Sequence, residues 1–324
     1  MDNFIFNNYT PKGFCREYVE IKGNSSQLAM FMATVLGIKP LMDDWINAGR
    51  LKEFRKVCKQ YGLKIREDVL FDSVPKSDLP VNILGRDFIT TTSAYGYPVG
   101  SRQDIGVHVF ISKNEALLKE GMWYPVIIKN RVIFQPRIDS LKYGYTLGYP
   151  ECCIKFFRKF NNWLKYSYLY EVYSNTKGRP SFLCNPFLKD TSFSYIYHMP
   201  CSYDCKATVR LTSRLRTEIK RREPGYVDLV DGYLKKSFLA FYERKIYCFD
   251  GSLRNNEIKY KRFQFTTYTK KEYEDEYSGY FKQADTVKLL GRNIILSRGG
   301  KVIRQLELKW SSFAPEFPFM IQFS

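Results

Sequence analysis

The sequence has little histidine and lacks long hydrophobic runs. Only His108 and His198 occur among 324 residues, whereas cysteine occurs eight times. Nowhere do about 18 apolar residues follow one another, which argues against a transmembrane helix. The first residues include neither a basic segment nor a long apolar one, so no secretory signal is visible and we expect a cytoplasmic protein. In that reducing compartment, clustered thiols are more often metal ligands or catalytic groups than disulfides.

The short motifs of several enzyme classes are also missing. The sequence contains no phosphate-binding P-loop, no Gly-x-Gly-x-x-Gly after a strand, no His-Glu-x-x-His and no Gly-x-Ser-x-Gly. It also lacks the Cys-x3-Cys-x2-Cys run of radical enzymes that use adenosylmethionine. These absences argue against nucleotide-binding folds of the common kinds, zinc peptidases, serine hydrolases and radical chemistry.

The composition is that of a folded and strongly basic protein. Apolar residues make up 44% of the chain and aromatic residues 17%, which is ample for a sizeable core. Lysine and arginine outnumber aspartate and glutamate by 51 to 33, giving a net charge of +18. Such a surplus indicates an anionic partner such as nucleic acid, a phosphorylated metabolite or an acidic membrane surface. The alternative is a basic surface that is simply solvated.

The N-terminal third combines predicted helices and strands. Cap residues and helically spaced apolar residues predict helices over 24–37 and 41–61. The β-branched run 105–112 predicts a buried strand, and a hairpin is expected over 124–135. Residues 87–103 are rich in hydroxyl groups and glycine, which suits either a substrate-facing loop or an ordinary surface connection.

The centre of the chain is predicted to be helical. Pro150 suits a first helical position, and the apolar residues that follow it are spaced helically. This helix would carry Cys152 and Cys153 in its first turn. Further helices are predicted over 202–222 and 227–236.

The C-terminal region changes character from residue 237 onward, where short apolar runs are separated by turn signals. The predicted strands are 238–242, 246–249, 258–268, 286–290, 293–297 and 302–308. We therefore expect an α+β fold. A helical cysteine-bearing core domain (105–236) would be flanked by an N-terminal α/β region (1–104) and a basic antiparallel β module (237–324).

Two cysteine clusters indicate a metal site. Cys152 and Cys153 are adjacent, whereas Cys201 and Cys205 are four residues apart and follow His198. Residues four apart share one face of a helix, and a histidine in the preceding loop can fold back onto that face. Unpaired N–H groups at a helix start favour thiolate over thiol. We therefore expect all five side chains to be metal ligands in one pocket.

The ligand spacing leaves the identity of the metal open. His-x2-Cys-x3-Cys is not a zinc-finger spacing, and tandem cysteines are unusual around one zinc ion, whose ligands must spread tetrahedrally. An iron–sulfur cluster accommodates neighbouring cysteines better, because they can bind different irons. We expect an iron–sulfur cluster, with zinc as the alternative. Two further hypotheses are a metal-free site, with a cysteine nucleophile and His198 as its base, and unrelated buried cysteines.

Three residues near the clusters are candidates for supporting roles. Glu151 and Asp204 adjoin the cysteines and, as acidic first-turn residues, would stabilise the helix starts. Alternatively, they would orient His198 or transfer protons. Cys184 lies between two prolines and could approach the same pocket or be a buried structural residue.

The remaining cysteines and histidine are predicted to be structural. Cys15, Cys58 and Cys248 stand alone in the sequence, which is typical of small buried hydrophobic residues. His108 lies among valines and a phenylalanine in a predicted strand. We expect it to be a core histidine.

The helix predicted over 202–222 carries a basic outer face, on which only Glu218 is acidic. Its basic residues are Lys206, Arg210, Arg214, Arg216, Lys220, Arg221 and Arg222. We expect Lys206, Arg210, Arg214 and Lys220 to bind a nucleic acid or other polyanion and to lead it toward the cysteines. Tyrosine and phenylalanine, with 25 residues of each, are available to stack on bases.

The two motifs together carry a resemblance. Gly-Tyr-Pro-Glu-Cys-Cys at 148–153, followed by His-Met-Pro-Cys-Ser-Tyr-Asp-Cys at 198–205, resembles the paired signature of an uncharacterised family of microbial proteins known as a domain of unknown function. The likeness covers residues 105 to 250. It implies that the family's signature residues are Cys152, Cys153, His198, Cys201 and Cys205, and it carries no established activity.

These observations lead to three hypotheses about function. The first is an enzyme that uses a cysteine-bound metal or cluster on a nucleic-acid or phosphorylated substrate. The second is a non-catalytic nucleic-acid-binding protein whose metal is structural. Structural sites are closed by four protein ligands, whereas catalytic sites keep one position open, so the ligand count discriminates between the two. The third is a metal-free thiol sensor or sulfur-transfer protein.

Overall fold

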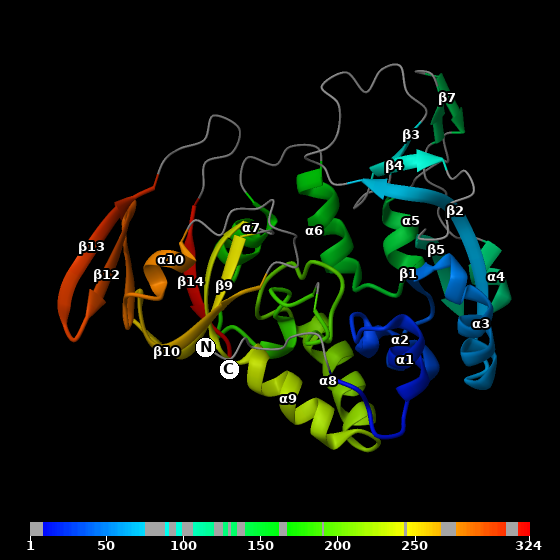
Figure 1. Cartoon of the computed structure of the whole chain (residues 1–324), viewed down its shortest axis with the longest axis horizontal. Helices are drawn as coiled ribbons and strands as arrows, with labels where there is room; N and C mark the ends of the chain where they lie inside the picture. Colours follow the sequence, from blue (N-terminus) through cyan, green and yellow to red (C-terminus); the bar gives the residue numbers. More distant parts are fainter. Residues whose placement is uncertain are drawn as a thin grey trace. The chain divides into compact units, whose positions relative to one another are not determined.

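The fold is described here from a computed structural model (Figure 1). The described residues are 9–74, 88–90, 95–98, 106–119, 126–128, 131–134, 140–161, 167–189, 191–242, 245–266, 277–308 and 317–324. Helices and antiparallel sheets both contribute, which confirms the α+β class.

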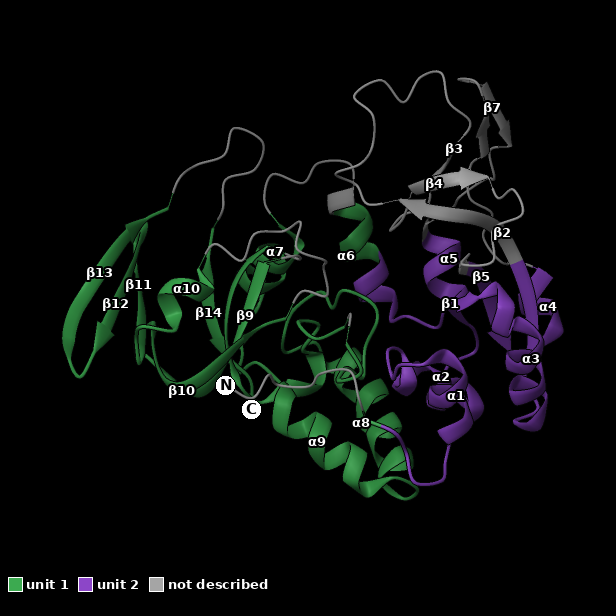
Figure 2. Cartoon of the chain, viewed as in Figure 1, with its two compact units in different colours: residues 1–9, 155–324 green, residues 10–154 purple. Residues whose placement is uncertain are grey.

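The chain divides into two compact units (Figure 2). The N-terminal unit comprises residues 10–154, and the C-terminal unit comprises residues 1–9 and 155–324. The division falls within one helix, α6 (Glu151–Asn161). The boundary between the two units therefore differs from the boundaries expected from the sequence, which divided the chain into 1–104, 105–236 and 237–324.

The N-terminal unit is built around an antiparallel sheet of strand order β1-β5-β2-β4-β3-β6-β7. Its strands are β1 (Met42–Asn47), β2 (Lys64–Val74), β3 (Phe88–Thr90), β4 (Tyr95–Pro98), β5 (Gly106–Ser112), β6 (Val126–Ile128) and β7 (Arg131–Phe134). The first part of β2 pairs with β5 and the last part pairs with β4. The strand over 105–112 and the hairpin after it are confirmed.

Two predictions for this unit are wrong. The segment 41–61 is not one helix, because β1 precedes a short 3₁₀ turn and the helix begins only at Leu51. The segment 87–103 is not one loop, because β3 and β4 lie within it; its other residues are outside the described part.

The N-terminal unit also contains helices, and aromatic side chains pack between several of them. The helices are α1 (Arg16–Lys22), α2 (Leu28–Val35), η1 (Ala48–Arg50), α3 (Leu51–Gln60), α4 (Glu115–Lys119) and α5 (Ser140–Thr146). Tyr18 stacks on Phe31 at 4.3 Å between ring centroids, and Phe54 packs beside both. All three side chains are buried, so the helices are held by apolar burial and ring packing. The helix expected over 24–37 is confirmed as α2.

The C-terminal unit places most of its helices before its sheet in the chain, whereas the short helix α10 lies between strands β10 and β11. The helices after α6 are α7 (Tyr168–Ser174), η3 (Phe182–Cys184), α8 (Lys206–Lys220), α9 (Pro224–Leu234) and α10 (Ser278–Phe281). Pro224 occupies the first turn of α9, a position where its missing N–H costs nothing. Arg216 of α8 forms a bidentate ion pair with the buried Asp231 of α9, which ties the two helices together.

The sheet of the C-terminal unit is the predicted antiparallel module. Its strand order is β13-β12-β11-β10-β9-β8-β14. The strands are β8 (Ser237–Tyr242), β9 (Lys245–Arg254), β10 (Glu257–Phe265), β11 (Thr286–Leu290), β12 (Asn293–Arg298), β13 (Lys301–Glu307) and β14 (Phe319–Gln322). The six strands expected from the sequence are confirmed, and β14 was not predicted.

Local backbone geometry explains the turn between β9 and β10 and the close contact between these two strands. Asn255 and Asn256, with φ of 50° and 57°, form the two-residue turn between β9 and β10. Gly251 of β9 lies so close to β10 that a Cβ atom there would stand 2.0 Å from the Lys259 carbonyl oxygen. Only glycine fits that approach. Within the described ranges, no helix has the length and apolarity needed to cross a membrane.

Candidate metal centre

The first cysteine pair lies at the start of α6. Gly148 has a φ of 75°, and a Cβ atom there would lie 2.5 Å from Pro40 Cδ, so both conformation and space call for glycine. The Pro150 carbonyl oxygen then accepts from the Cys153 N–H at 2.9 Å. Cys152 and Cys153 therefore occupy the first helical turn, as predicted.

The second cysteine pair lies at the entrance of α8, but not within one turn of it. The helix begins at Lys206 with Cys205 as its N-cap, so the helix expected over 202–222 starts four residues later than predicted. Cys201 belongs to the turn before the helix, where the Cys205 N–H donates to the Ser202 carbonyl oxygen at 3.2 Å. The shared helical face expected for the two sulfurs is therefore wrong, and the loop conformation positions Cys201 instead.

Hydrogen bonds from the end of α7 hold this loop. The Asn175 side-chain amide donates to the Cys201 carbonyl oxygen at 2.6 Å, and the Tyr203 N–H donates to Thr176 Oγ1 at 2.9 Å. Tyr203 is fully buried, and its hydroxyl donates to the Leu169 carbonyl oxygen at 3.0 Å. The backbone on both sides of Cys201 is thus fixed by groups that the motif itself does not contain.

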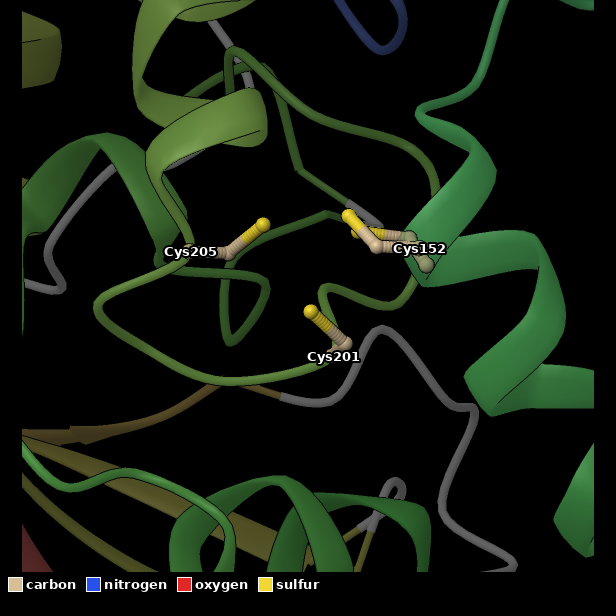
Figure 3. Close-up of side chains that lie close together, drawn as sticks. Cys152, Cys201 and Cys205 are labelled. Atoms are coloured by element: carbon tan, nitrogen blue, oxygen red, sulfur yellow. The ribbon is translucent and has the colours of Figure 1, made fainter.

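The sulfur atoms of Cys152, Cys153, Cys201 and Cys205 come together, and all four lie within 4.8 Å of one another (Figure 3). The Sγ atoms of the adjacent Cys152 and Cys153 are 3.9 Å apart. Cys153 and Cys205 are buried, Cys201 is partly buried and Cys152 is exposed. The set could hold a metal ion, as expected from the sequence, and one of its four cysteines is exposed.

His198 is not a member of this group. Its side chain is buried, and its Nε2 lies 3.0 Å from the hydroxyl of Thr208 in the first turns of α8. The four cysteines complete a set of four ligands without the imidazole. A ligand role for His198 stays a prediction.

The electrostatics of both helix starts suit thiolates. The aligned backbone dipoles of α6 and α8 place positive potential at the start of each helix. Four thiolates around a divalent ion carry a net charge of −2, and this positive potential offsets part of it.

The three candidates for supporting roles are placed differently from one another. Glu151 is exposed at the start of α6. Asp204 accepts from the Gly178 N–H at 2.7 Å. Burial tends to raise the pKa of this carboxyl group, but hydrogen bonds from the Ser202 side chain and from backbone N–H groups outweigh it and lower the pKa. Asp204 thus anchors the loop 177–178.

Cys184 lies beside the four-cysteine group as a fifth thiol. It is buried, and its Sγ is 3.6 Å from the Cys205 carbonyl oxygen. Burial is the main cause that raises the pKa of its thiol, and the neighbouring Cys205 raises it further. A protonated thiol that donates to the backbone of a ligand cysteine would help to hold that cysteine in place.

The remaining cysteines and His108 are buried, as expected. Burial raises the pKa of Cys58 to about 12 and also raises the pKa of Cys248, so both stay protonated thiols. Cys15 is fully buried. His108 is also fully buried, and its Nε2 lies 3.2 Å from a carboxylate oxygen of Asp43.

The basic residues of α8, together with Arg221 and Arg222 directly after it, divide into two groups. Ion pairs engage Arg216, Lys220, Arg221 and Arg222, whose acidic partners are Asp231, Asp228 and Glu218. The three others, Lys206, Arg210 and Arg214, are exposed and form no ion pair with any residue in the described ranges. Since they are spaced four apart, they share one face of the helix that begins at Cys205. We call these three residues the α8 basic stripe.

Comparisons with known proteins provide no functional information on this site, so its interpretation depends on its geometry. The chain matches no family model, no curated protein and no solved structure. The resemblance of its paired motifs to an uncharacterised microbial family therefore stays a prediction. Sequence reasoning had identified the four cysteines, but it missed the residues that anchor their loop, Asn175, Thr176 and Tyr203, because nothing in a local pattern marks long-range hydrogen bonds.

Proposed function

We propose that this chain is a non-catalytic binding protein in which four cysteines hold one zinc ion and the α8 basic stripe binds a nucleic acid or similar polyanion. The observation that carries the proposal is the convergence of four sulfurs within 4.8 Å at the start of the helix that displays the stripe. Eight cysteines in a chain with this site suit a reducing compartment such as the cytoplasm.

The distances between the sulfurs favour one metal ion over a cluster. Zinc–sulfur bonds of about 2.3 Å in a tetrahedron place the sulfurs about 3.8 Å apart. The Cys152 and Cys153 sulfurs, at 3.9 Å, lie close to that value, so the adjacent cysteines suit two corners of one tetrahedron. In a four-iron cluster each cysteine binds a different iron, so the sulfurs stand farther apart than on a single ion. Zinc thus replaces iron–sulfur as the favoured cofactor.

The number of ligands favours a structural role for the metal. Four protein sulfurs complete a tetrahedral zinc ion, whereas a catalytic zinc keeps one position for water or substrate. The bound ion would join the start of α6 to the start of α8 and would contribute folding free energy directly. This argument supports the binding-protein hypothesis over an enzyme.

The α8 basic stripe supports the choice of a polyanion as partner. Its three side chains extend along one helix face, and their charges are not neutralised by ion pairs within the described part of the chain. Lys220, which the sequence suggested as a fourth member, has its amine 3.4 Å from Asp228 and is left out. Phosphate contacts by such residues supply affinity through counterion release, without reading sequence.

Metal analysis of the purified protein tests the metal centre. We expect about one zinc per chain, no sulfide and a colourless solution, because the four sulfurs fit a single ion. Cys205→Ser should lose the zinc, whereas Cys248→Ser should retain it as the matched control, since that thiol lies in strand β9.

Other outcomes of the analysis would contradict the proposal in distinct ways. A brown protein with iron and stoichiometric sulfide would mean a cluster and would restore the reactive site as the first hypothesis. Iron without sulfide would keep the single-ion geometry but overturn zinc. A protein that binds no metal, with Cys205→Ser as stable as the wild type, would leave only a thiol site.

A further inference from the structure

A buried lysine lies in the N-terminal unit, in a segment separate from the α8 basic stripe in the sequence. Lys39 follows α2, where its N–H donates to the Ala33 carbonyl oxygen at 3.1 Å. Its side chain is 9% exposed, and its Nζ donates to the Leu147 carbonyl oxygen at 2.7 Å. The ring of Tyr149 covers it, with Nζ 4.5 Å from the ring centroid. Lys39 forms no ion pair with any residue that the structure describes, although buried lysines are almost always paired.

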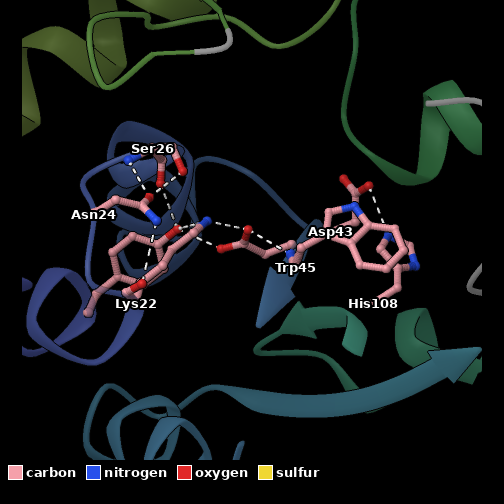
Figure 4. A network of polar contacts seen from close by, with 8 residues as sticks. Lys22, Asn24, Ser26, Asp43, Trp45 and His108 are labelled. Carbon is pink, nitrogen blue, oxygen red and sulfur yellow. Dashed lines mark hydrogen bonds and ion pairs between the residues drawn. The ribbon is translucent and has the colours of Figure 1, made fainter. Parts of the chain in front are cut away.

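A carboxylate with its own partners lies within electrostatic range of this amine. Asp43 of β1 is held by His108 of β5, with 3.2 Å between Nε2 and Oδ2 (Figure 4). The Tyr143 hydroxyl also donates to this carboxylate, at 3.4 Å. The His108 ring contacts the aromatic rings of Trp45 and Phe110, with 4.8 and 5.0 Å between ring centroids. The Asp43 side chain is one-third exposed, so the cluster reaches solvent at this carboxylate.

The surroundings of Lys39 make its amine easier to deprotonate. Burial lowers the pKa of Lys39 to about 8, and the negative charge of Asp43 opposes this only in part. At pH 7 such an amine is neutral in about 9% of molecules, against about 0.04% for a lysine of ordinary pKa, a ratio of about 200. Only the neutral amine is a nucleophile.

We propose that Lys39 is a nucleophilic amine that binds a small aldehyde or ketone as an imine. The Nζ lone pair would attack the carbonyl carbon, and the C–N bond would form as the C=O double bond opens. The resulting carbinolamine would lose its oxygen as water, which takes both protons of the attacking neutral amine. No oxidant or reductant is needed, and the reaction is reversible.

The competing interpretation is purely structural. Leu147 directly follows α5, so Lys39 caps the C-terminal end of that helix through a carbonyl group that has no partner within it. A lysine that only caps the helix would contribute stability but would not react faster than an exposed lysine. The rate of reaction at Lys39 in the intact protein separates the two interpretations.

The experiment is reductive labelling of the full chain with propionaldehyde and cyanoborohydride, read by peptide mass spectrometry. At pH 7 we expect Lys39 to acquire the propyl group at least about tenfold faster than the exposed Lys206 in the same sample. The neutral fraction of Lys39 is about 200-fold larger, but a less basic amine is a weaker nucleophile and a buried one is less accessible, so the ratio of rates is smaller than about 200. The rate at Lys39 should level off above pH 8, whereas the rate at Lys206 should still rise.

Variants and conditions complete the test. Lys39→Arg keeps a donor for the Leu147 carbonyl group and should remove the label from this peptide alone. Asp43→Asn should shift the pH profile of Lys39 labelling to lower pH, because the carboxylate raises the amine pKa. Labelling of Lys39 no faster than that of Lys206, or a profile still rising above pH 9, would overturn the proposal. The result does not depend on the metal, so chelator-treated protein should behave alike.

Discussion

Removing the three charges of the α8 basic stripe should reduce the salt dependence of nucleic-acid binding by a predictable amount. The change is the triple variant Lys206→Gln, Arg210→Gln and Arg214→Gln. Each basic group that neutralises a phosphate contributes about 0.9 to the slope of log affinity against log salt on duplex DNA and about 0.7 on single strands. Three exposed groups should therefore lower the slope by about 2.7 on a duplex or about 2.1 on a single strand.

The chain offers a matched control at the C-terminal end of α8 and in the two residues after it. Lys220→Gln, Arg221→Gln and Arg222→Gln also remove one lysine and two arginines, so the net charge changes equally. These three residues have acidic partners in Asp228 and Glu218, and their removal should leave the slope nearly unchanged. The slope is measured by fluorescence anisotropy of a labelled oligonucleotide over about 50 to 200 mM salt.

Equal slopes for the two triple variants would refute the reasoning. That result would mean that net charge, and not the position of the stripe, governs binding. A wild-type protein that shows no salt-dependent binding at all would remove the polyanion from the proposed function while leaving the metal centre intact, because the zinc content of each variant is measured separately.

Three further predictions concern stability and are read from thermal or denaturant unfolding. Arg216→Ala should cost about 3 kcal/mol, because it leaves the buried Asp231 without its cation, whereas an exposed pair costs under about 1 kcal/mol; a loss of that smaller size would contradict the role of the pair. Gly251→Ala should destabilise the C-terminal sheet by more than about 3 kcal/mol, since its Cβ would meet the Lys259 carbonyl oxygen at 2.0 Å; an unaffected midpoint would show that the strands can separate locally. Folding lowers the pKa of Lys39, so the unfolded chain binds more protons than the folded one between about pH 8 and 10.4. The free energy of unfolding should therefore rise with pH across that window, by up to about 3 kcal/mol. Lys39→Met should abolish the rise.

The strand β1 shows why part of the fold was mispredicted from sequence. Its buried positions alternate as Met42, Asp44 and Ile46, and a carboxylate in the middle hides the period of two. Asp44 is buried because the Tyr18 hydroxyl donates to it at 2.6 Å and Lys22 forms an ion pair with it (Figure 4). Those partners lie in another element, so no local pattern could reveal them.

The C-terminal sheet was predictable because its signals are local. Two-residue turns such as Asn255-Asn256 and paired glycines interrupt short apolar runs, and each hairpin joins neighbours in sequence. The last strand, β14, pairs with β8 from far along the chain, and that pairing has no turn signal to mark it.

The sequence alone determined which atoms were available for the metal centre, because the two cysteine clusters are recognisable from their short spacing and from the proline that precedes each. The tertiary structure decided what those atoms can hold. The separations of the four sulfurs depend on a loop anchored by Asn175 and Thr176, and these separations distinguish one tetrahedral ion from a cluster. In the same way, the sequence shows seven basic residues over 206–222, but only the structure separates the three without an ion pair in the described ranges from the four that pair with Asp231, Asp228 and Glu218.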